Sequence, residues 1–116
     1  MGTSIVFDYM CRDDVKTHVE VDCINRKVSV TNYTDVILDQ ALGLRPATIE
    51  NIQYFFKDRC FEETRPDKDT LLELLGLTQY NPYDIVKQTR GRMWGDDFWI
   101  RFEGDTATWA DVINQK

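Results

Sequence analysis

Side chains that could bind a metal ion lie close together near the start of the chain. They are two thiols, one imidazole and two carboxylates: Cys11, Asp13, Asp14, His18 and Cys23. Zinc in proteins takes thiolate, imidazole and carboxylate ligands. The spacing matches no standard zinc finger, and the sequence contains no CxxC pair. We therefore expect no cofactor, with Cys23 in the core and His18 on the surface; a zinc site of Cys11, His18 and Cys23 is the alternative.

The sequence offers little for catalysis. A serine, threonine or cysteine nucleophile needs a positioned base, and His18 is the single histidine. Phosphate-binding motifs of the GxGxxG or GxxxxGK type are missing from the sequence. Adjacent acidic pairs, Asp13-Asp14, Glu62-Glu63 and Asp96-Asp97, fall in predicted loops, where solvent keeps both carboxylates ionised. We therefore expect that the protein is not an enzyme.

Residues 1–46 are predicted to form strands that would position these side chains. An apolar run at 4–9 is followed by a polar loop at 11–14, and apolar and polar residues then alternate at 17–23 and 27–33. A two-residue turn at Asn25-Arg26 would pair Cys23 with Val28 and bring the apolar faces together. The opposite face is predicted to be solvated, with an acidic contact face as the alternative. It carries His18, Glu20 and Asp22.

Residues 47–116 are predicted to be mostly helical with one strand. Helices are expected from Pro46 to Arg59, from about Pro66 to Leu75 and from Pro82 to Arg90, with a short last helix at 109–114. Capping signals precede three of them: Thr64 with Asp67, Asn81, and Thr108. The alternation at Phe98–Phe102 predicts a strand. The expected fold is a single α+β domain over residues 1–116, with a small antiparallel sheet of three N-terminal strands and one C-terminal strand packed by three main helices.

Composition excludes several classes of protein. The chain has 116 residues with 20 acids and 14 bases, a net charge of -6, and a pI near 4.7. A general nucleic-acid coating protein is disfavoured, because phosphate binding needs a basic surface. No apolar run approaches the roughly 20 residues of a membrane span. Residues 1–7 lack the basic and apolar regions of a signal peptide, so we expect a cytoplasmic protein that makes no membrane contact.

Two of the predicted helices resemble a loose helix-turn-helix, which raises the alternative of DNA binding. Residues 76–80 would connect them, a longer link than is usual. Lys87, Arg90 and Arg92 could contact phosphates, whereas Asp84 would face the bases. Because the whole chain is acidic, we expect no direct DNA binding.

A tryptophan beside an arginine on the last strand suggests a binding face for a partner protein. Trp99 and Arg101 point to the face opposite Phe98 and Phe102, and both residue types are enriched at interface hot spots. Acids lie in or beside this strand: Asp96, Asp97, Glu103 and Asp105. If the face is exposed, it offers an aromatic anchor ringed by negative charge to a basic partner. The alternative is that a helix covers the face and Trp99 belongs to the core.

A set of turn and apolar motifs between residues 41 and 103 resembles a segment of bacterial HipA-like kinases. The motifs are Leu42-Gly43-Leu44, Lys57-Asp58-Arg59, Thr64-Arg65, Leu75-Gly76-Leu77, Arg90-Gly91 and Asp96-Asp97-Phe98-Trp99. In those kinases this segment precedes the phosphotransfer core, which has no counterpart in this sequence, so kinase activity does not carry over. The sequence is also similar to freestanding short proteins of phages and mobile elements. The resemblance implies such a background.

These observations together predict a non-enzymatic, acidic protein-interaction module. We expect an accessory protein of a phage or mobile element that inhibits a larger, basic, nucleic-acid-handling host protein, such as a CRISPR effector nuclease. Two alternatives stay open. The chain could be a regulatory partner of a HipA-like kinase toxin, or a helix-turn-helix-like regulator that binds DNA.

Overall fold

A computed structural model describes residues 4–93 and 95–113 and shows an α+β fold. The strands are β1 (Ser4–Cys11), β2 (Asp14–Asp22), β3 (Lys27–Asn32) and β4 (Phe98–Phe102). The helices are α1 (Ile49–Asp58), α2 (Lys68–Leu74), α3 (Pro82–Thr89) and α4 (Trp109–Ile113), and residues Ile37–Asp39 form a 3₁₀ turn, η1. The four strands form one antiparallel sheet in the order β3-β2-β1-β4. The predicted fold class is therefore confirmed.

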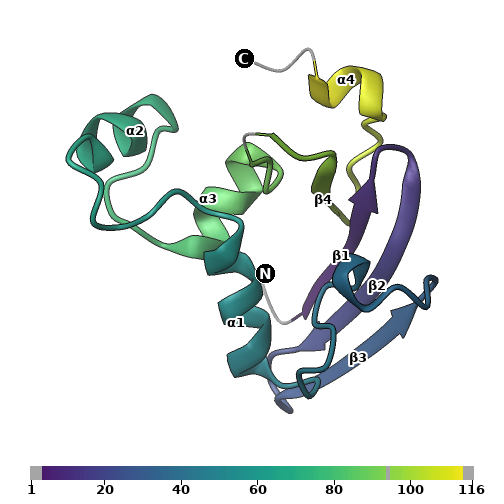
Figure 1. Cartoon of the computed structure of the whole chain (residues 1–116). Coiled ribbons are helices and arrows are strands. Elements are labelled where there is room, and N and C mark those ends of the chain that lie inside the picture. Colours follow the sequence, from purple (N-terminus) through teal and green to yellow (C-terminus); the bar gives the residue numbers. More distant parts are fainter. Residues whose placement is uncertain (1–3, 94, 114–116) are drawn as a thin grey trace.

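Helices α1 and α3 lie on one face of the sheet, and α4 lies at one end of the other (Figure 1). The face toward α1 and α3 holds the main core, in which aromatic rings stack across elements; Phe7 packs against Phe55 and Phe56 of α1. A smaller core lies under α4 and is made of Met10, Trp99, Ala107 and Val112. Alternation along β4 therefore sends Phe98, Ile100 and Phe102 to the main core and Trp99 to the smaller one.

The β2–β3 hairpin differs from the predicted register by two residues. Val21 pairs with Val28, so the turn holds four residues, 23–26, in place of two. The cause is the carboxylate of Asp22, which accepts hydrogen bonds from the backbone N–H groups of Ile24 and Asn25 and from the Asn25 side chain. Because the shift is an even number, the apolar face still meets the main core.

Several predicted element ends are corrected by local hydrogen bonds. The loop expected at 11–14 shrinks to Arg12 and Asp13, with Arg12 at a positive φ of 54°, so β1 and β2 are longer than predicted. α1 begins at Ile49 because the Thr48 hydroxyl accepts from the Asn51 N–H at 3.2 Å. The capping box expected at Thr64 and Asp67 does not form, since the Asp67 carboxylate accepts from Arg65 and makes no side-chain cap.

The caps of the last two helices follow the sequence more closely. Asn81 accepts from the Asp84 N–H at 3.1 Å and Pro82 is in the first turn of α3, as predicted. The carboxylate of Asp111 accepts from the Thr108 N–H at 2.9 Å at the start of α4. Asn114, the expected end of α4, is outside the described residues. Among the described helices, none is long and apolar enough to cross a membrane.

Candidate protein-interaction surface

Trp99 is fully buried, which corrects the expectation of an exposed aromatic anchor on β4. Its exposed fraction is 0%, and it packs under α4 with Met10 and Val112. Its indole N–H donates to the carbonyl of Arg12 at 2.7 Å. The alternative, that a helix covers this face, is the one the structure shows. The sequence could not decide this, because the five residues of α4 carry too little periodicity to reveal which surface they cover.

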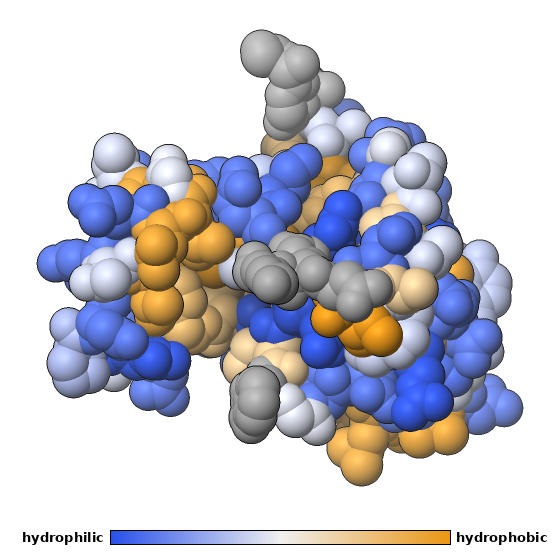
Figure 2. All heavy atoms as spheres, turned by 90° about the horizontal axis from the view of Figure 1, so that it is seen from above, coloured by the Kyte–Doolittle hydropathy of each residue, from blue (hydrophilic) through white to orange (hydrophobic). Residues whose placement is uncertain are grey.

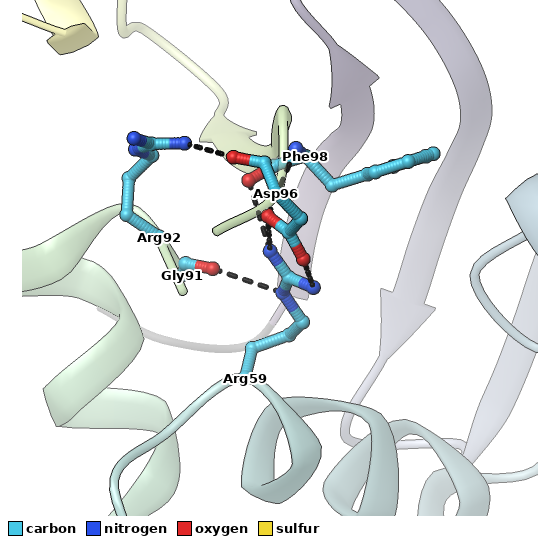
Figure 3. A network of polar contacts seen from close by, with 5 residues as sticks. All are labelled: Arg59, Gly91, Arg92, Asp96 and Phe98. Carbon is cyan, nitrogen blue, oxygen red and sulfur yellow. Dashed lines mark hydrogen bonds and ion pairs between the residues drawn. The ribbon is translucent and has the colours of Figure 1, made fainter. Parts of the chain in front are cut away.

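Asp96, one of the acids predicted to ring a partner site, is bound to Arg59 within the chain. Arg59 follows α1, is almost completely buried and donates two hydrogen bonds to the Asp96 carboxylate. The same guanidinium donates to the carbonyls of Gly91 and Phe98, both at 2.9 Å, and Arg92 donates to the carbonyl of Asp96 (Figure 3). This network ties the end of α1 to the loop between α3 and β4, so Asp96 has a structural role.

The other charged residues of the predicted partner face also lie in intramolecular contacts. Asp97 pairs with Arg12 at 2.9 Å, and Asp105 accepts from Arg90 at 2.7 Å. Burial raises the pKa of Asp105, but hydrogen bonds from Arg90 and from the Ala107 N–H outweigh it and leave the pKa below its usual value. Arg101 donates to Asp8 at 3.3 Å. Glu103 is exposed. Most of the charge predicted to attract a partner here is thus balanced within the molecule.

The basic residues considered for DNA binding lie beside aromatic rings and acids. The ammonium of Lys87 lies 4.9 Å from the ring centre of Phe102, and the guanidinium of Arg92 lies 4.9 Å from that of Trp109. Arg90 is the residue after α3, has a positive φ of 56° and binds Asp105. These contacts hold the three cations against the protein surface, where they stabilise the fold.

The residues considered for zinc binding do not converge. Cys23 packs against the main core, whereas His18 points to the opposite face of the sheet. His18 lies between two carboxylates, with Nδ1 2.7 Å from Asp8 and Nε2 2.9 Å from Glu20. These two hydrogen bonds, the one to Asp8 first, raise the pKa of His18 above 6.5. Within the part of the chain that the structure describes, no three histidine, cysteine or acidic side chains cluster as metal ligands would.

An apolar groove of about 600 Å³ lies between α1, the start of α3 and the ends of β1 and β2. Its walls include Ile5, Val21, Ile49 and Tyr83. Glu50, at its rim, is held by Arg26 at 2.7 Å. The lining is mostly apolar, and its charged residues are Glu50 and Lys57 of α1.

The segment between β3 and α1 exposes large apolar side chains. We call the following residues the apolar platform: Tyr33, Val36, Ile37, Leu38 and Leu44. Of the nine large apolar side chains that are exposed in the described residues, five belong to this platform, with Leu38 92% and Leu44 85% exposed. A Cβ on Gly43 would lie 3.4 Å from Cγ2 of Ile37, so the backbone beside Leu44 lies close to η1. Figure 2 shows apolar surface at its lower edge, on the side that faces the reader in Figure 1, where η1 lies.

Hydrogen bonds connect the platform segment to β2 and stabilise its turn. The Thr17 side chain, with no exposed surface, accepts from the Ala41 N–H and donates to Asn32, at 3.1 and 3.0 Å. The Gln40 amide donates to the carbonyl of Thr34 at 3.0 Å, and Leu42 is buried in the main core. The segment is therefore fixed at both ends while its apolar side chains face solvent. An ordered apolar patch of this kind is typical of an interaction site.

Sequence reasoning missed the platform. The only signal was the run Val36-Ile37-Leu38, which lies between polar residues and outside any periodic element. Three apolar residues in a predicted loop do not show whether they will be buried or exposed. The chain matches no protein-family model, and neither the curated proteins nor the solved structures include one that is significantly similar to it.

Proposed function

We propose that this chain is a non-enzymatic protein-interaction module whose apolar platform binds a larger, basic protein. The observation that supports it most strongly is the combination of exposure and order in the platform. Because Thr17 holds the backbone at Ala41, the segment would lose less backbone conformational entropy on binding than a mobile loop would. Desolvating them would supply the apolar part of the binding free energy.

The charge of the chain suggests the chemistry of the partner. Asp35 precedes η1 and Asp39 is its last residue, and the net charge of the chain is -6. An acidic surface accelerates association with a basic protein. Nucleic-acid-handling proteins carry such a basic surface because they bind phosphates. The specific form of the proposal is a phage or mobile-element protein that inhibits a host nucleic-acid-handling protein, with a CRISPR effector nuclease as the first partner to examine.

The experiment compares two single substitutions of exposed apolar residues. Leu38→Ser changes the platform, and Ile24→Ser changes the β2–β3 turn, where Ile24 is 71% exposed. Each protein is immobilised, host proteins are captured and identified by mass spectrometry, and the affinity of the purified partner is then measured. Candidate nucleases are also assayed for DNA cleavage in the presence of each variant.

We expect Ile24→Ser to bind the purified partner as the unchanged chain does and Leu38→Ser to bind it at least about tenfold more weakly, the effect of losing about 1.4 kcal/mol. Equal binding by both variants would overturn the role of the platform. A captured kinase would favour the alternative of a regulatory partner for a HipA-like toxin. Duplex DNA binding that depends on Lys87 would favour the DNA-binding alternative.

A further inference from the structure

Helix α2 and its flanking loops form an arm that projects from the rest of the molecule (Figure 1). We call residues 61–79 the α2 arm. It contains five acids and two bases, and so carries half of the net charge of the chain. Arg65 is paired with Asp67 at 2.9 Å. Lys68 reaches Asp69 only at 3.9 Å. The remaining acids of the arm are therefore poorly compensated within it.

A shallow hollow of about 470 Å³ lies on this arm. Its lining is Asp69, Leu72, Glu73, Gly76, Leu77 and Thr78. Leu72 is buried and Leu77 half-buried, so they give the hollow an apolar floor. Asp69 and Glu73 are four residues apart on α2 and share one face of the helix at the edge of the hollow. In the described residues, no cationic side chain forms an ion pair with Glu73.

This arrangement costs the free protein some stability. Like charges at positions i and i+4 destabilise a helix by about 0.2–0.5 kcal/mol. A cation placed between the two carboxylates would reverse the sign of this effect. A lysine or arginine side chain also has an aliphatic stem that can pack on leucine while its charged end reaches the carboxylates.

We propose, building on the interaction function above, that the hollow of the α2 arm receives a lysine or arginine side chain of the basic partner. The stem would pack on Leu72 and Leu77, and the charged end would lie between Asp69 and Glu73. Leu74, which is 77% exposed, does not line the hollow. Figure 2 shows apolar surface on the α2 side of the molecule, at the left, bordered by hydrophilic surface.

The chemistry of the hollow favours a basic side chain over a free cation. Calcium takes six to eight oxygen ligands, and magnesium takes six in a near-ideal octahedron. The hollow offers two carboxylates and the hydroxyl of Thr78 above an apolar floor. Such a floor supplies no oxygen ligands but suits a hydrocarbon stem.

The first test uses a fluorescein-labelled amphipathic helical peptide of leucine and lysine, with its ε-acetylated form as the uncharged control. Binding to the full chain is measured by fluorescence anisotropy. Asp69→Asn with Glu73→Gln removes both carboxylates of the hollow. Glu62→Gln with Glu63→Gln removes the same charge from the same arm but outside the hollow. Thermal midpoints of all variants confirm that they fold.

We expect the hollow variant to bind the lysine peptide at least about fivefold more weakly and the control variant to change binding by less than about twofold, given the strength of exposed ion pairs. The acetylated peptide should bind weakly to all of them. Equal losses in the two variants would show general charge attraction and overturn the proposal, as would no loss in either.

A second pair of variants compares an arginine inside the hollow with one outside it. Thr78→Arg places a guanidinium in it from the chain itself, whereas Thr70→Arg adds the same charge to an exposed position of α2 that does not line it. We expect Thr78→Arg to weaken binding of the lysine peptide, because its own guanidinium occupies the hollow. Thr70→Arg should weaken binding much less. Equal binding by the two variants would contradict the assigned position of the basic side chain.

The same variants separate this inference from the proposed function. If the partner binds through Leu38 and its affinity does not change in the Asp69 and Glu73 variant, the interaction function stands and the role of the hollow fails. If the peptide binds in the hollow but no partner depends on Leu38, the hollow stands and the platform fails.

Discussion

The β4 end of the sheet and the apolar platform differ in what their large side chains contact. At the β4 end, Trp99 is buried under α4 and Arg59 donates to one carboxylate and two backbone carbonyls. On the platform, Leu38 and Leu44 face solvent above a backbone held by Thr17. The large side chains at the β4 end therefore stabilise the fold, whereas those of the platform are exposed to solvent. Substitutions should therefore separate the two regions by their effect on the free energy of unfolding.

The largest effect is expected for Trp99→Ala. This change removes a fully buried indole and leaves the Arg12 carbonyl without its donor. Large-to-small core substitutions of this kind cost about 3–5 kcal/mol. Urea unfolding followed by circular dichroism measures the loss, with the half-buried Trp109→Ala as the milder comparison. A change under about 1 kcal/mol for Trp99→Ala would mean that α4 does not cover this face.

The next effect is expected for Arg59→Met, which keeps much of the side-chain volume but removes the guanidinium. Asp96 and the carbonyls of Gly91 and Phe98 then lose their shared donor. Removing one partner of a buried charged network costs about 3 kcal/mol, less where the other partner reaches water, as Asp96 does here.

Asp96→Asn provides the control for the Arg59 substitution. It should cost less, because the amide oxygen can still accept and the carbonyl contacts of Arg59 remain. The coupling between the two substitutions is measured by a double-mutant cycle in urea. An additive double variant would contradict a shared network.

The sequence predicted the β4 end in part and the platform not at all. The alternation at Phe98–Phe102 predicted the strand and the face of each residue, because a period of two fixes which side chains point together. It did not show that α4 covers Trp99 or that Arg59, far away in the sequence, binds Asp96. Such contacts depend on how elements pack, which local patterns do not encode.

The β2–β3 hairpin and the starts of the helices also show which local features the sequence predicts and which it does not. The face of β2 was predicted correctly, but the register was not, since the side chain of Asp22 selects a longer turn. The cap of α3 at Asn81 was predicted because its signal is contained in four consecutive residues. The start of α1 was displaced because Thr48 caps the helix after Pro46.

A smaller change in stability is expected when the pH changes, because of His18 on the face of the sheet opposite the main core. Hydrogen bonds to Asp8 and then to Glu20 raise the pKa of His18 above 6.5. The protonated imidazole donates to both carboxylates, whereas the neutral ring can donate to only one. The stabilisation is therefore fully present below about pH 6.5 and is lost as the pH rises through the folded-state pKa.

The measurement is the difference in thermal midpoint between the unchanged protein and His18→Gln. We expect this difference to shrink as the pH rises from about 6 to about 8, since histidine titrates in this range. Neighbouring charges are Asp8 and Glu20, with Arg101 bound to the far oxygen of Asp8. Glu20→Gln should reduce the dependence on pH, because it removes one of the two acceptors. A difference that grows with pH would contradict the assigned direction.

Substitutions on the apolar platform should change stability least, although they should weaken partner binding most. Leu38→Ser and Leu44→Ser remove side chains that are almost fully exposed, so each should change the free energy of unfolding by less than about 0.5 kcal/mol. Leu42→Ser is the matched control, because the same substitution two residues before Leu44 opens a cavity in the main core and buries a hydroxyl. Urea unfolding of the three variants tests the distinction directly. If Leu38→Ser destabilised the protein as much as Leu42→Ser, the platform would belong to the core in solution. The β4 end and the platform would then no longer differ, and partner binding would have to involve another surface.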